Sequence, residues 1–384
     1  MDIDNIIEQY FRSGFTNLEI LGVLEETHNV KLSLRTLERR LQKKRLWRRK
    51  NKTDVAEVAS FIEHQLQGSG RQHGYRWMHQ KCWMAGIVTD RETVRLLMRL
   101  LDPNRVDLRA QNRLRRRLYV SRGPNYVWHI DGYDKLKPYG ICINGCIDGF
   151  SRKMIWLEAY KTNSDPHIIA GYFIDAVMEY NGFPQKIRMD HGTENTYVAA
   201  MQRFLHNTEN ENGFDSVILG PSTGNQRIER WWCTLRSECT QFWMEHFDQL
   251  KADGYFVDSF LDKSLIQFCF LQTIQMELDE VVHTWNDHRI RSTNNPRAPP
   301  GRPTLMHGVP NLYGVPNFLQ SANLTKLEIC VEECHFKDFP CDVDVFHLCT
   351  ELMTEHRLVM TDDVYEITNL YVRLRQMISD GLRE

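Results

Sequence analysis

The sequence of 384 residues has no apolar run approaching the roughly 18 residues that a membrane span needs. It also has no amino-terminal leader with a basic start, an apolar stretch and a small-residue cleavage site. Its ten cysteines are scattered along the chain, which excludes a disulfide-stapled miniprotein. We therefore expect an intracellular protein in a reducing setting, in the nucleus if the source has one and otherwise in the cytoplasm or nucleoid. The length and the 42% hydrophobic content predict two to three folded domains.

The net charge is also small, at −2, but the charged residues are unevenly distributed along the chain. Residues 1–125 hold 25 Lys and Arg against 14 Asp and Glu, whereas the rest of the chain holds 23 against 36. A basic front part joined to an acidic remainder is typical of a polyanion-binding module attached to a different domain. Chance variation in surface charge is the alternative.

Residues 1–50 carry three short amphipathic helical patterns, the second after a Thr16 cap and the third after a Ser33 cap. This spacing predicts a helix-turn-helix DNA-binding domain. The third helix would present basic side chains to a DNA groove while its leucines face inward. These side chains are Arg35, Arg39, Arg40, Lys43 and Lys44. A solvated basic helix in an ordinary bundle is the alternative.

Residues 51–104 have the pattern of a second small helical domain, also expected to bind DNA. Residues 105–124 form a basic linker that includes Arg115, Arg116 and Arg117. Arginines in such a linker can contact phosphates without reading the base sequence. A flexible solubilising linker fits the same composition.

From residue 126 the apolar pattern changes to that of strands separated by turn residues, expected at 126–131, 141–147, 153–160, 186–190 and 216–219. Helices follow the third, fourth and fifth strands, one of them capped by Asp165-Pro166. Strands followed by alternating helices and strands predict a mixed sheet with helices packed on it. We assign 125–250 to this core, 251–305 to a helical extension with a Pro- and Arg-rich segment, and 306–384 to a C-terminal domain of unknown role.

Three carboxylates stand where such a sheet would bring them together: Asp131 in the first strand, Asp190 after the fourth, and Glu229 on the helix that follows the fifth. Singly, each is more typical of a turn, a cap or a solvated helix face. Together they resemble hard oxygen ligands, because two carboxylates about 4 Å apart repel by roughly 4 kcal/mol at an effective dielectric of 20 unless a cation lies between them. Two Mg²⁺ or Mn²⁺ ions would support an in-line displacement at phosphorus. Asn225, four residues before Glu229, and Arg236, seven after it, share its helix face.

Four ordered motifs carry a family resemblance. They are Trp128-x-x-Asp131, Ile147-Asp148-Gly149-Phe150-Ser151-Arg152, Asp190-x-Gly192-x-Glu194-Asn195 and Asn225-x-x-x-Glu229-Arg230-x-x-x-x-Leu235-Arg236. With 38 residues between Asp190 and Glu229, the chain resembles the integrase core family of retroviral integrases and insertion-sequence transposases. The resemblance covers about residues 70–305. The chain departs from it in lacking the His-His-Cys-Cys zinc module of retroviral integrases and in having no obvious basic β-barrel at the end.

The resemblance implies a ribonuclease H-like core with a five-stranded mixed sheet. It also implies that Asp131, Asp190 and Glu229 hold the metal ions, that Arg236 contacts DNA, and that Asn225 and Asn195 support the site. His191, beside Asp190, could help to position a proton or a phosphate, and a hydrogen-bonded structural histidine is the alternative that we prefer. The implied activity is DDE-type polynucleotidyl transfer, with cleavage at element ends and joining to double-stranded target DNA by a homo-oligomer. A catalytically silent DNA-binding regulator and a nuclease of the same fold are the alternatives.

For two further features we prefer a structural role to a functional one. Cysteines and histidines cluster in residues 330–349, but without a Cys-x-x-Cys pair reduced core cysteines fit better than structural zinc. Trp231 and Trp232 follow Glu229 and are expected to be core aromatics, although one could stack on a displaced base.

Overall fold

The computed structural model describes residues 2–47, 52–102, 120–207, 213–221, 224–292 and 299–381. The chain divides into two compact units, each assembled from segments far apart in the sequence. The first, here called the helical unit, comprises Met1–Tyr126, Asp148–Lys153 and Val282–Phe318. The second, the sheet unit, comprises Val127–Ile147, Met154–Val281 and Leu319–Glu384.

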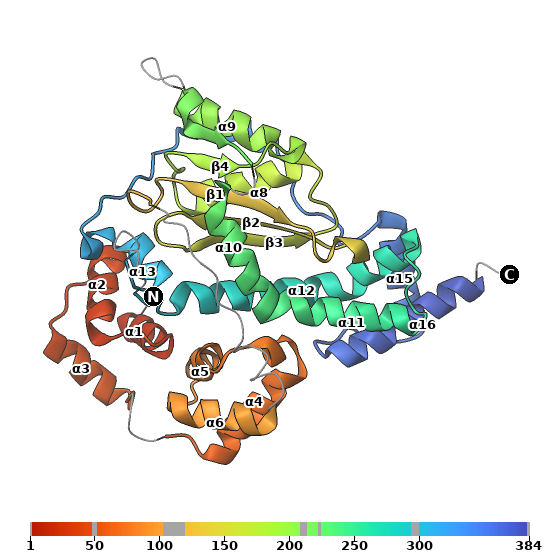
Figure 1. The fold of residues 1–384 in the computed structure, drawn as a ribbon, viewed down its shortest axis with the longest axis horizontal. Coiled ribbons are helices and arrows are strands. Elements are labelled where there is room, and N and C mark those ends of the chain that lie inside the picture. The colour runs from red at the N-terminus through yellow and green to blue at the C-terminus, as the bar shows by residue number, and fades with distance from the viewer. Residues whose placement is uncertain are drawn as a thin grey trace. The chain divides into compact units, whose positions relative to one another are not determined.

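The helical unit confirms the expectation of an all-helical amino-terminal region. Its helices are α1 (Ile3–Arg12), α2 (Asn17–His28), α3 (Leu34–Lys43), α4 (Val55–Gln67), α5 (Tyr75–Met84), α6 (Arg91–Leu101) and α13 (Pro303–Gly308) (Figure 1). Thr16 caps α2 by accepting a hydrogen bond from the Glu19 backbone N–H at 3.3 Å, and the Glu19 carboxylate accepts one from the Thr16 N–H at 2.7 Å. Ser33 likewise caps α3. Both predicted caps are therefore present.

The core of α1, α2 and α3 includes two residues from the far end of the unit's sequence. Leu305 and Val309 lie in the same buried cluster as Ile7, Leu24 and Leu37. A second apolar cluster holds α4, α5 and α6 together. The three amino-terminal helices are thus completed by the segment around α13, about 270 residues later in the chain.

Arg302 fixes this segment to the turn between α1 and α2. Its side chain is almost fully buried, its Nε lies 3.2 Å from Glu19 Oε2, and its guanidinium donates to the backbone carbonyls of Gly14 and Asp287. The guanidinium also lies 4.8 Å from the centre of the Phe15 ring. A planar group with five donors suits this site, because it satisfies several carbonyls and stacks on an aromatic ring at once.

The sheet unit contains a mixed sheet with strand order β3-β2-β1-β4-β5. The strands are β1 (Trp128–Tyr133), β2 (Cys142–Asp148), β3 (Met154–Tyr160), β4 (Ile187–Met189) and β5 (Val217–Leu219). Strands β2 and β3 pair antiparallel, whereas β1, β4 and β5 pair parallel. The predicted five-stranded mixed sheet of a ribonuclease H-like core is confirmed.

Helices accompany the sheet and extend from it. They are α8 (Pro166–Glu179), α9 (Thr196–His206), α10 (Gln226–Leu235), α11 (Gln241–Ala252), α12 (Phe260–Asp287, whose last turns belong to the helical unit), α14 (Leu324–Glu332), α15 (Val343–Glu355) and α16 (Val364–Gly381) (Figure 1). Asp165 caps α8, and Pro166 is its first residue, as the sequence predicts. Residues 319–381, which the sequence pattern did not resolve, supply α14, α15 and α16. Among the described residues, no helix is both long and apolar enough to cross a membrane.

Candidate active site

Strand β1 sends alternate side chains to opposite faces of the sheet. Trp128 is fully buried and its ring lies edge-on to that of Phe173 in α8, with the centroids 6.5 Å apart. His129 and Asp131 point the other way and contact residues of α10. One face of β1 is therefore an apolar layer, and the opposite face carries the acidic residue.

Asp131 is half-buried and accepts a hydrogen bond at Oδ2 from Trp232 Nε1, at 2.8 Å. Burial raises the pKa of Asp131 to about 7, and the negative charges of Glu229 and Asp190 push it in the same direction, against the hydrogen bond from Trp232. The three predicted carboxylates are thus close enough to act on one another electrostatically. A buried carboxylate facing like charges is a site that a cation would stabilise.

Asp190 follows β4, the strand that runs parallel beside β1, so Asp131 and Asp190 lie toward the same edge of the sheet. Its Oδ1 accepts hydrogen bonds from Asn195 Nδ2 at 2.9 Å and from the Gly192 N–H at 3.2 Å. Asn195 is buried, whereas His191 is exposed. Asn195 therefore orients the Asp190 carboxylate, and no side-chain hydrogen bond to the site is recorded for His191 among the described residues.

Asn225 connects the start of α10 to β1. Its amide Nδ2 donates to the Ile130 carbonyl at 2.8 Å, so its Oδ1 is the acceptor for His129 Nδ1, 2.7 Å away. Burial lowers the pKa of His129 to about 3, and the ring is neutral with its proton on Nδ1. The backbone N–H of Glu229 donates to the Asn225 carbonyl at 3.2 Å. Asn225 thereby fixes the position of Glu229 relative to the strand that carries Asp131.

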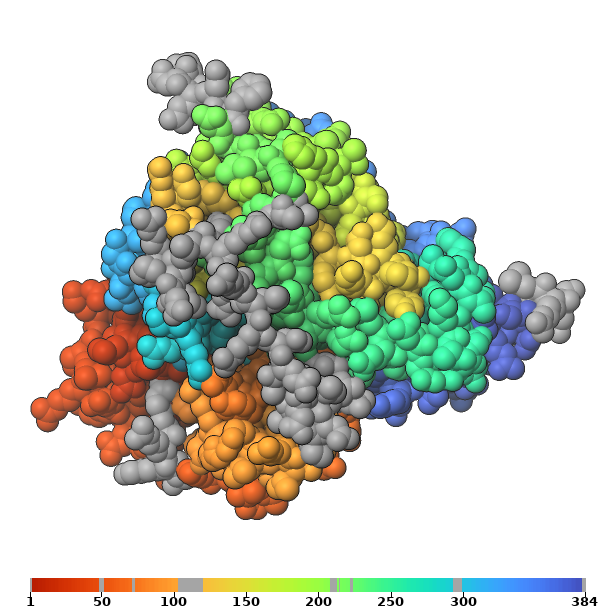
Figure 2. Space-filling model, in the orientation of Figure 1, coloured from red at the N-terminus to blue at the C-terminus, as the bar shows by residue number. Residues whose placement is uncertain are grey.

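Glu229 is half-buried on α10, and burial together with the charge of Asp190 raises its pKa. Atoms of α10 reach the surface on the face drawn in Figure 2 (green, centre). Within the described ranges, no three His, Cys, Asp or Glu side chains are close enough to hold one metal ion by themselves. The donor set nevertheless fits Mg²⁺, which keeps several waters and binds through one or two carboxylates plus substrate phosphates.

Arg236 lies just beyond α10, in a single π-helical turn, Arg236–Thr240, that leads into α11. It is exposed, and its Nε donates to Gln241 Oε1 at 2.8 Å. Thr240 at the end of this turn is within hydrogen-bond distance of Tyr133 OH, 3.0 Å away, at the end of β1. Such turns are frequent at functional sites. The contact of Arg236 with DNA stays a prediction.

The basic side chains of α3 fall into two groups. Arg35, Arg39 and Lys43 are exposed, whereas Arg40 pairs with Asp4 and Lys44 pairs with Glu8 at 2.9 Å. The last two therefore also hold α3 against α1. The remaining predicted DNA contacts, Arg115, Arg116 and Arg117, lie outside the described residues.

The cysteines, all within the described residues, form no disulfide. Burial raises the pKa of Cys330 and Cys341 to about 11 and that of Cys334 and Cys349 to about 12. All four side chains are buried, as expected of reduced core cysteines.

Two side chains of the site were missed by sequence reasoning. His129 stands two residues before Asp131 on the same face of the strand, a spacing that could have identified it as a neighbour of the site. Trp232 was expected to be a core aromatic, and it is buried, but its indole N–H donates to Asp131.

Comparison with known families supports the arrangement. The model of the integrase core domain family matches residues 118–301, the segment that contains β1 to β5, the three carboxylates and the helices around them. No curated protein matches the sequence. Residues 118–301 are an integrase core domain.

Proposed function

We propose that this chain is a DDE-type polynucleotidyl transferase that processes DNA ends and joins them to target DNA, with Asp131, Asp190 and Glu229 as its metal ligands. The observation that carries the proposal is the mutual electrostatic effect of these carboxylates at one edge of a ribonuclease H-like sheet. Their sequence positions match the family's acidic triad, and the matched segment contains all of them.

The protein's own residues hold and orient the acidic groups. Trp232 donates to Asp131, Asn195 donates to Asp190, and Asn225 sets the start of the helix that carries Glu229. Two divalent cations bound there would activate water and then a DNA 3′-hydroxyl, and would stabilise the leaving oxygen at phosphorus. Because the pKa of Asp131 is raised to about 7, this carboxylate keeps part of its proton near neutral pH unless a cation displaces it, so cation binding is expected to release a proton and to strengthen as pH rises.

The helical unit would recognise the element ends. Support comes from the exposed Arg35, Arg39 and Lys43 on one helix and from the basic balance of the first 125 residues. Contacts to about six phosphates would give a slope of roughly −5 for log affinity against log salt concentration. Pairing of two element ends would require at least two copies of the chain.

The test is incubation of the full chain with labelled duplexes and plasmid in Mg²⁺ or Mn²⁺, followed by sizing of the products on denaturing gels. Labelled ends joined to plasmid by the wild type, but not by Asp190→Asn or Glu229→Gln, would support the proposal. Asp134→Asn is a matched control, because Asp134 pairs with Lys137 at the surface. Nicking without joining would indicate a nuclease, and salt-sensitive binding of authentic ends without cleavage would indicate a silent DNA-binding protein.

A further inference from the structure

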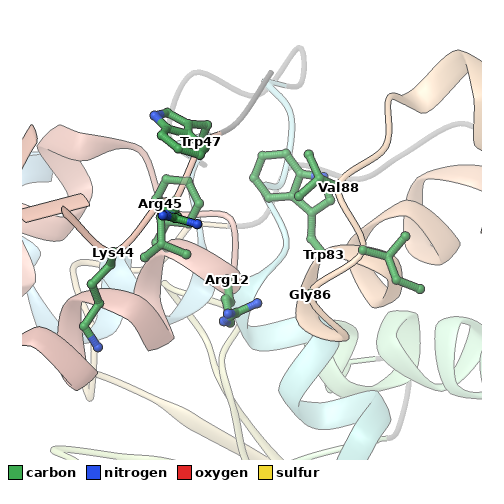
Figure 3. Close-up of a pocket in the computed structure, with 10 residues that line it drawn as sticks. Arg12, Lys44, Arg45, Trp47, Trp83, Gly86 and Val88 are labelled. Carbon is green, nitrogen blue, oxygen red and sulfur yellow. The ribbon is translucent and has the colours of Figure 1, made fainter. Parts of the chain in front are cut away.

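A cavity of about 220 Å³ lies in the helical unit, where the ends of α1 and α3 face the end of α5. Two indoles, three basic side chains and a glycine contribute to its wall: Trp47, Trp83, Arg12, Lys44, Arg45 and Gly86. Figure 3 shows Trp47 and Arg45 on one side, Trp83 and Gly86 on the other, and Arg12 between them. Nothing in the candidate active site uses these residues.

The two indoles differ in how firmly they are held. Trp83 is fixed, because its Nε1 donates to the Thr89 carbonyl at 3.4 Å and its ring packs against that of His79, with the centroids 5.6 Å apart. Trp47 is half-buried and has no hydrogen-bond or ring partner among the described residues. A fixed aromatic face beside an adjustable one suits a flat aromatic ligand, since the second ring can close on the ligand when it enters.

The basic side chains leave the cavity positively charged. Arg12 and Lys44 both donate to the Glu8 carboxylate, at 2.7 and 2.9 Å, which lowers the pKa of Glu8 and keeps it ionised. Arg45 is exposed and has no recorded ion-pair partner in the described part of the chain. The three cationic side chains of the cavity thus have one carboxylate, that of Glu8, to balance their charge. The carboxyl-terminal ends of the neighbouring helices offset part of this charge, and Arg45 is the cation best able to bind an anion.

The backbone conformations of Arg45 and Gly86 also bear on the cavity. Arg45 adopts a left-handed conformation, with φ of 56°, at the position after the α3 cap where glycine is usual. A long cationic side chain at this unfavourable position is consistent with a role for that side chain. Across the cavity, Gly86 has φ of 79°, and a Cβ there would lie 2.7 Å from Arg12 Nη1, so the guanidinium can pack directly against the glycine backbone.

We propose that this cavity binds one unpaired nucleotide of DNA, with the base against Trp47 and Trp83 and its phosphate at Arg45. Aromatic faces beside cations are the usual means of holding single-stranded nucleic acid. Only the base needs to enter the cavity, because the sugar and the phosphate can stay at its edge, beside the exposed Arg45. The inference rests on the proposed function only in taking DNA as the partner of the helical unit.

The test measures binding of the full chain in EDTA, so that no strand transfer occurs. The probes are a fluorescein-labelled blunt duplex and the same duplex with a one-nucleotide 3′ or 5′ overhang, whose unpaired base is 2-aminopurine. Stacking of one base on an aromatic side chain predicts that one overhang binds roughly 5- to 100-fold more tightly than the blunt duplex. The 2-aminopurine fluorescence should fall on binding, because the base stacks on an indole.

Trp47→Leu is expected to remove the preference for the overhang and the fluorescence change while leaving the affinity for the blunt duplex unchanged. Arg45→Asn, which can keep the left-handed backbone, should weaken overhang binding and reduce the salt slope by about 1. Lys31→Asn is the matched control, because it removes one charge from a side chain that is 84% exposed and does not line the cavity. The control should retain the preference.

Equal affinity of the wild type for blunt and overhang duplexes would overturn the proposal, as would a preference that survives in both Trp47→Leu and Arg45→Asn. Tighter binding of an RNA overhang than of a DNA overhang would overturn the assignment to DNA. A missing preference with strand transfer intact refutes the cavity proposal alone. A Trp47-dependent preference without strand transfer refutes the proposed function alone.

Discussion

Replacement of Asn225 by alanine is expected to uncouple α10 from β1. The side chain is 1% exposed, and it donates to the Ile130 carbonyl at 2.8 Å and accepts from His129 Nδ1 at 2.7 Å. Its removal deprives a buried carbonyl and a buried imidazole N–H of these partners, at roughly 1–3 kcal/mol each. We therefore expect the contact between α10 and β1 to lose about 2–6 kcal/mol.

Hydrogen exchange is the suitable assay, because a chain with two compact units does not unfold in a single two-state step. The expected loss corresponds to exchange roughly 30- to 25,000-fold faster at protected amides of α10 and β1. Asn163→Ala is the matched control. Asn163 is also a buried asparagine that donates to a strand carbonyl, that of Ile143 at 2.8 Å, but this hydrogen bond does not involve α10.

Loss of the Asn225 hydrogen bonds should also weaken metal binding and activity. With α10 no longer held to β1, Glu229 loses its fixed distance from Asp131, so Mn²⁺ affinity and strand transfer should both fall in Asn225→Ala. Unchanged exchange in α10 would refute the reasoning. Equal acceleration of α10 exchange by Asn163→Ala would show that general destabilisation, rather than the Asn225 hydrogen bonds, is responsible.

Three further predictions concern stability. Arg302→Leu removes a buried cation from Glu19, so the helical unit should lose about 3–5 kcal/mol, seen as faster limited proteolysis between α1 and α2. Burial alone would raise the pKa of Asp262, but the hydrogen bond from Arg375 Nε at 2.7 Å and further donors lower the pKa below its usual value. The ionised Asp262 therefore stabilises the folded chain above the unfolded pKa of about 3.9, and this contribution is lost as pH falls through the folded pKa. Hydrogen exchange of protected amides in α12 and α16 should show Asp262→Asn less stable than wild type at neutral pH, with the difference vanishing in acid. Mn²⁺ at about 100 times its Kd should stabilise the wild type by roughly 2.7 kcal/mol in the same assay, and EDTA or Asp190→Asn should abolish the effect.

The sheet and the grouping of the acidic residues could be predicted because both depend on local patterns. Alternating apolar residues identify strands, and Asp131 and Asp190 stand within or just after strands that pair in parallel. The carboxyl ends of parallel strands meet at one edge, so the two carboxylates must approach. Glu229 could be added because a helix follows the fifth strand.

Sequence reasoning named Asn195 and Asn225 as supporting residues, but the contacts of His129 and Trp232 could not be predicted, because they join distant positions. His129 and Asn225 are 96 residues apart, and Asp131 and Trp232 are 101 apart. Nothing in the local sequence distinguishes an indole that donates to a carboxylate from one that only fills a core. Which buried polar atoms meet depends on how α10 packs on β1, and that packing follows from the whole fold.

The association of residues 282–318 with the amino-terminal helices was also hidden from the sequence. The segment begins within the last turns of α12, and the sequence pattern divided it between a helical extension (251–305) and a C-terminal domain (306–384), yet Leu305 and Val309 complete the apolar cluster of α1, α2 and α3. The short helix α13 has too few apolar positions to indicate its partner. The one local signal that could have indicated this association is Arg302, because a cation between Gly301 and Pro303 in an apolar segment needs hydrogen-bond acceptors from another part of the chain.

The groups that orient the acidic residues are all electrically neutral, and this bears on how the site would work. Asp131 accepts from an indole, Asp190 accepts from an amide and a backbone N–H, and the nearby His129 is held uncharged by burial. Across the described ranges, none of the three carboxylates forms an ion pair with Lys, Arg or His. A lysine or arginine partner would have stabilised the same side chains but cancelled their charge. Neutral donors fix the carboxylates in position and leave their attraction for a cation undiminished, which is what a metal-dependent transferase requires of them.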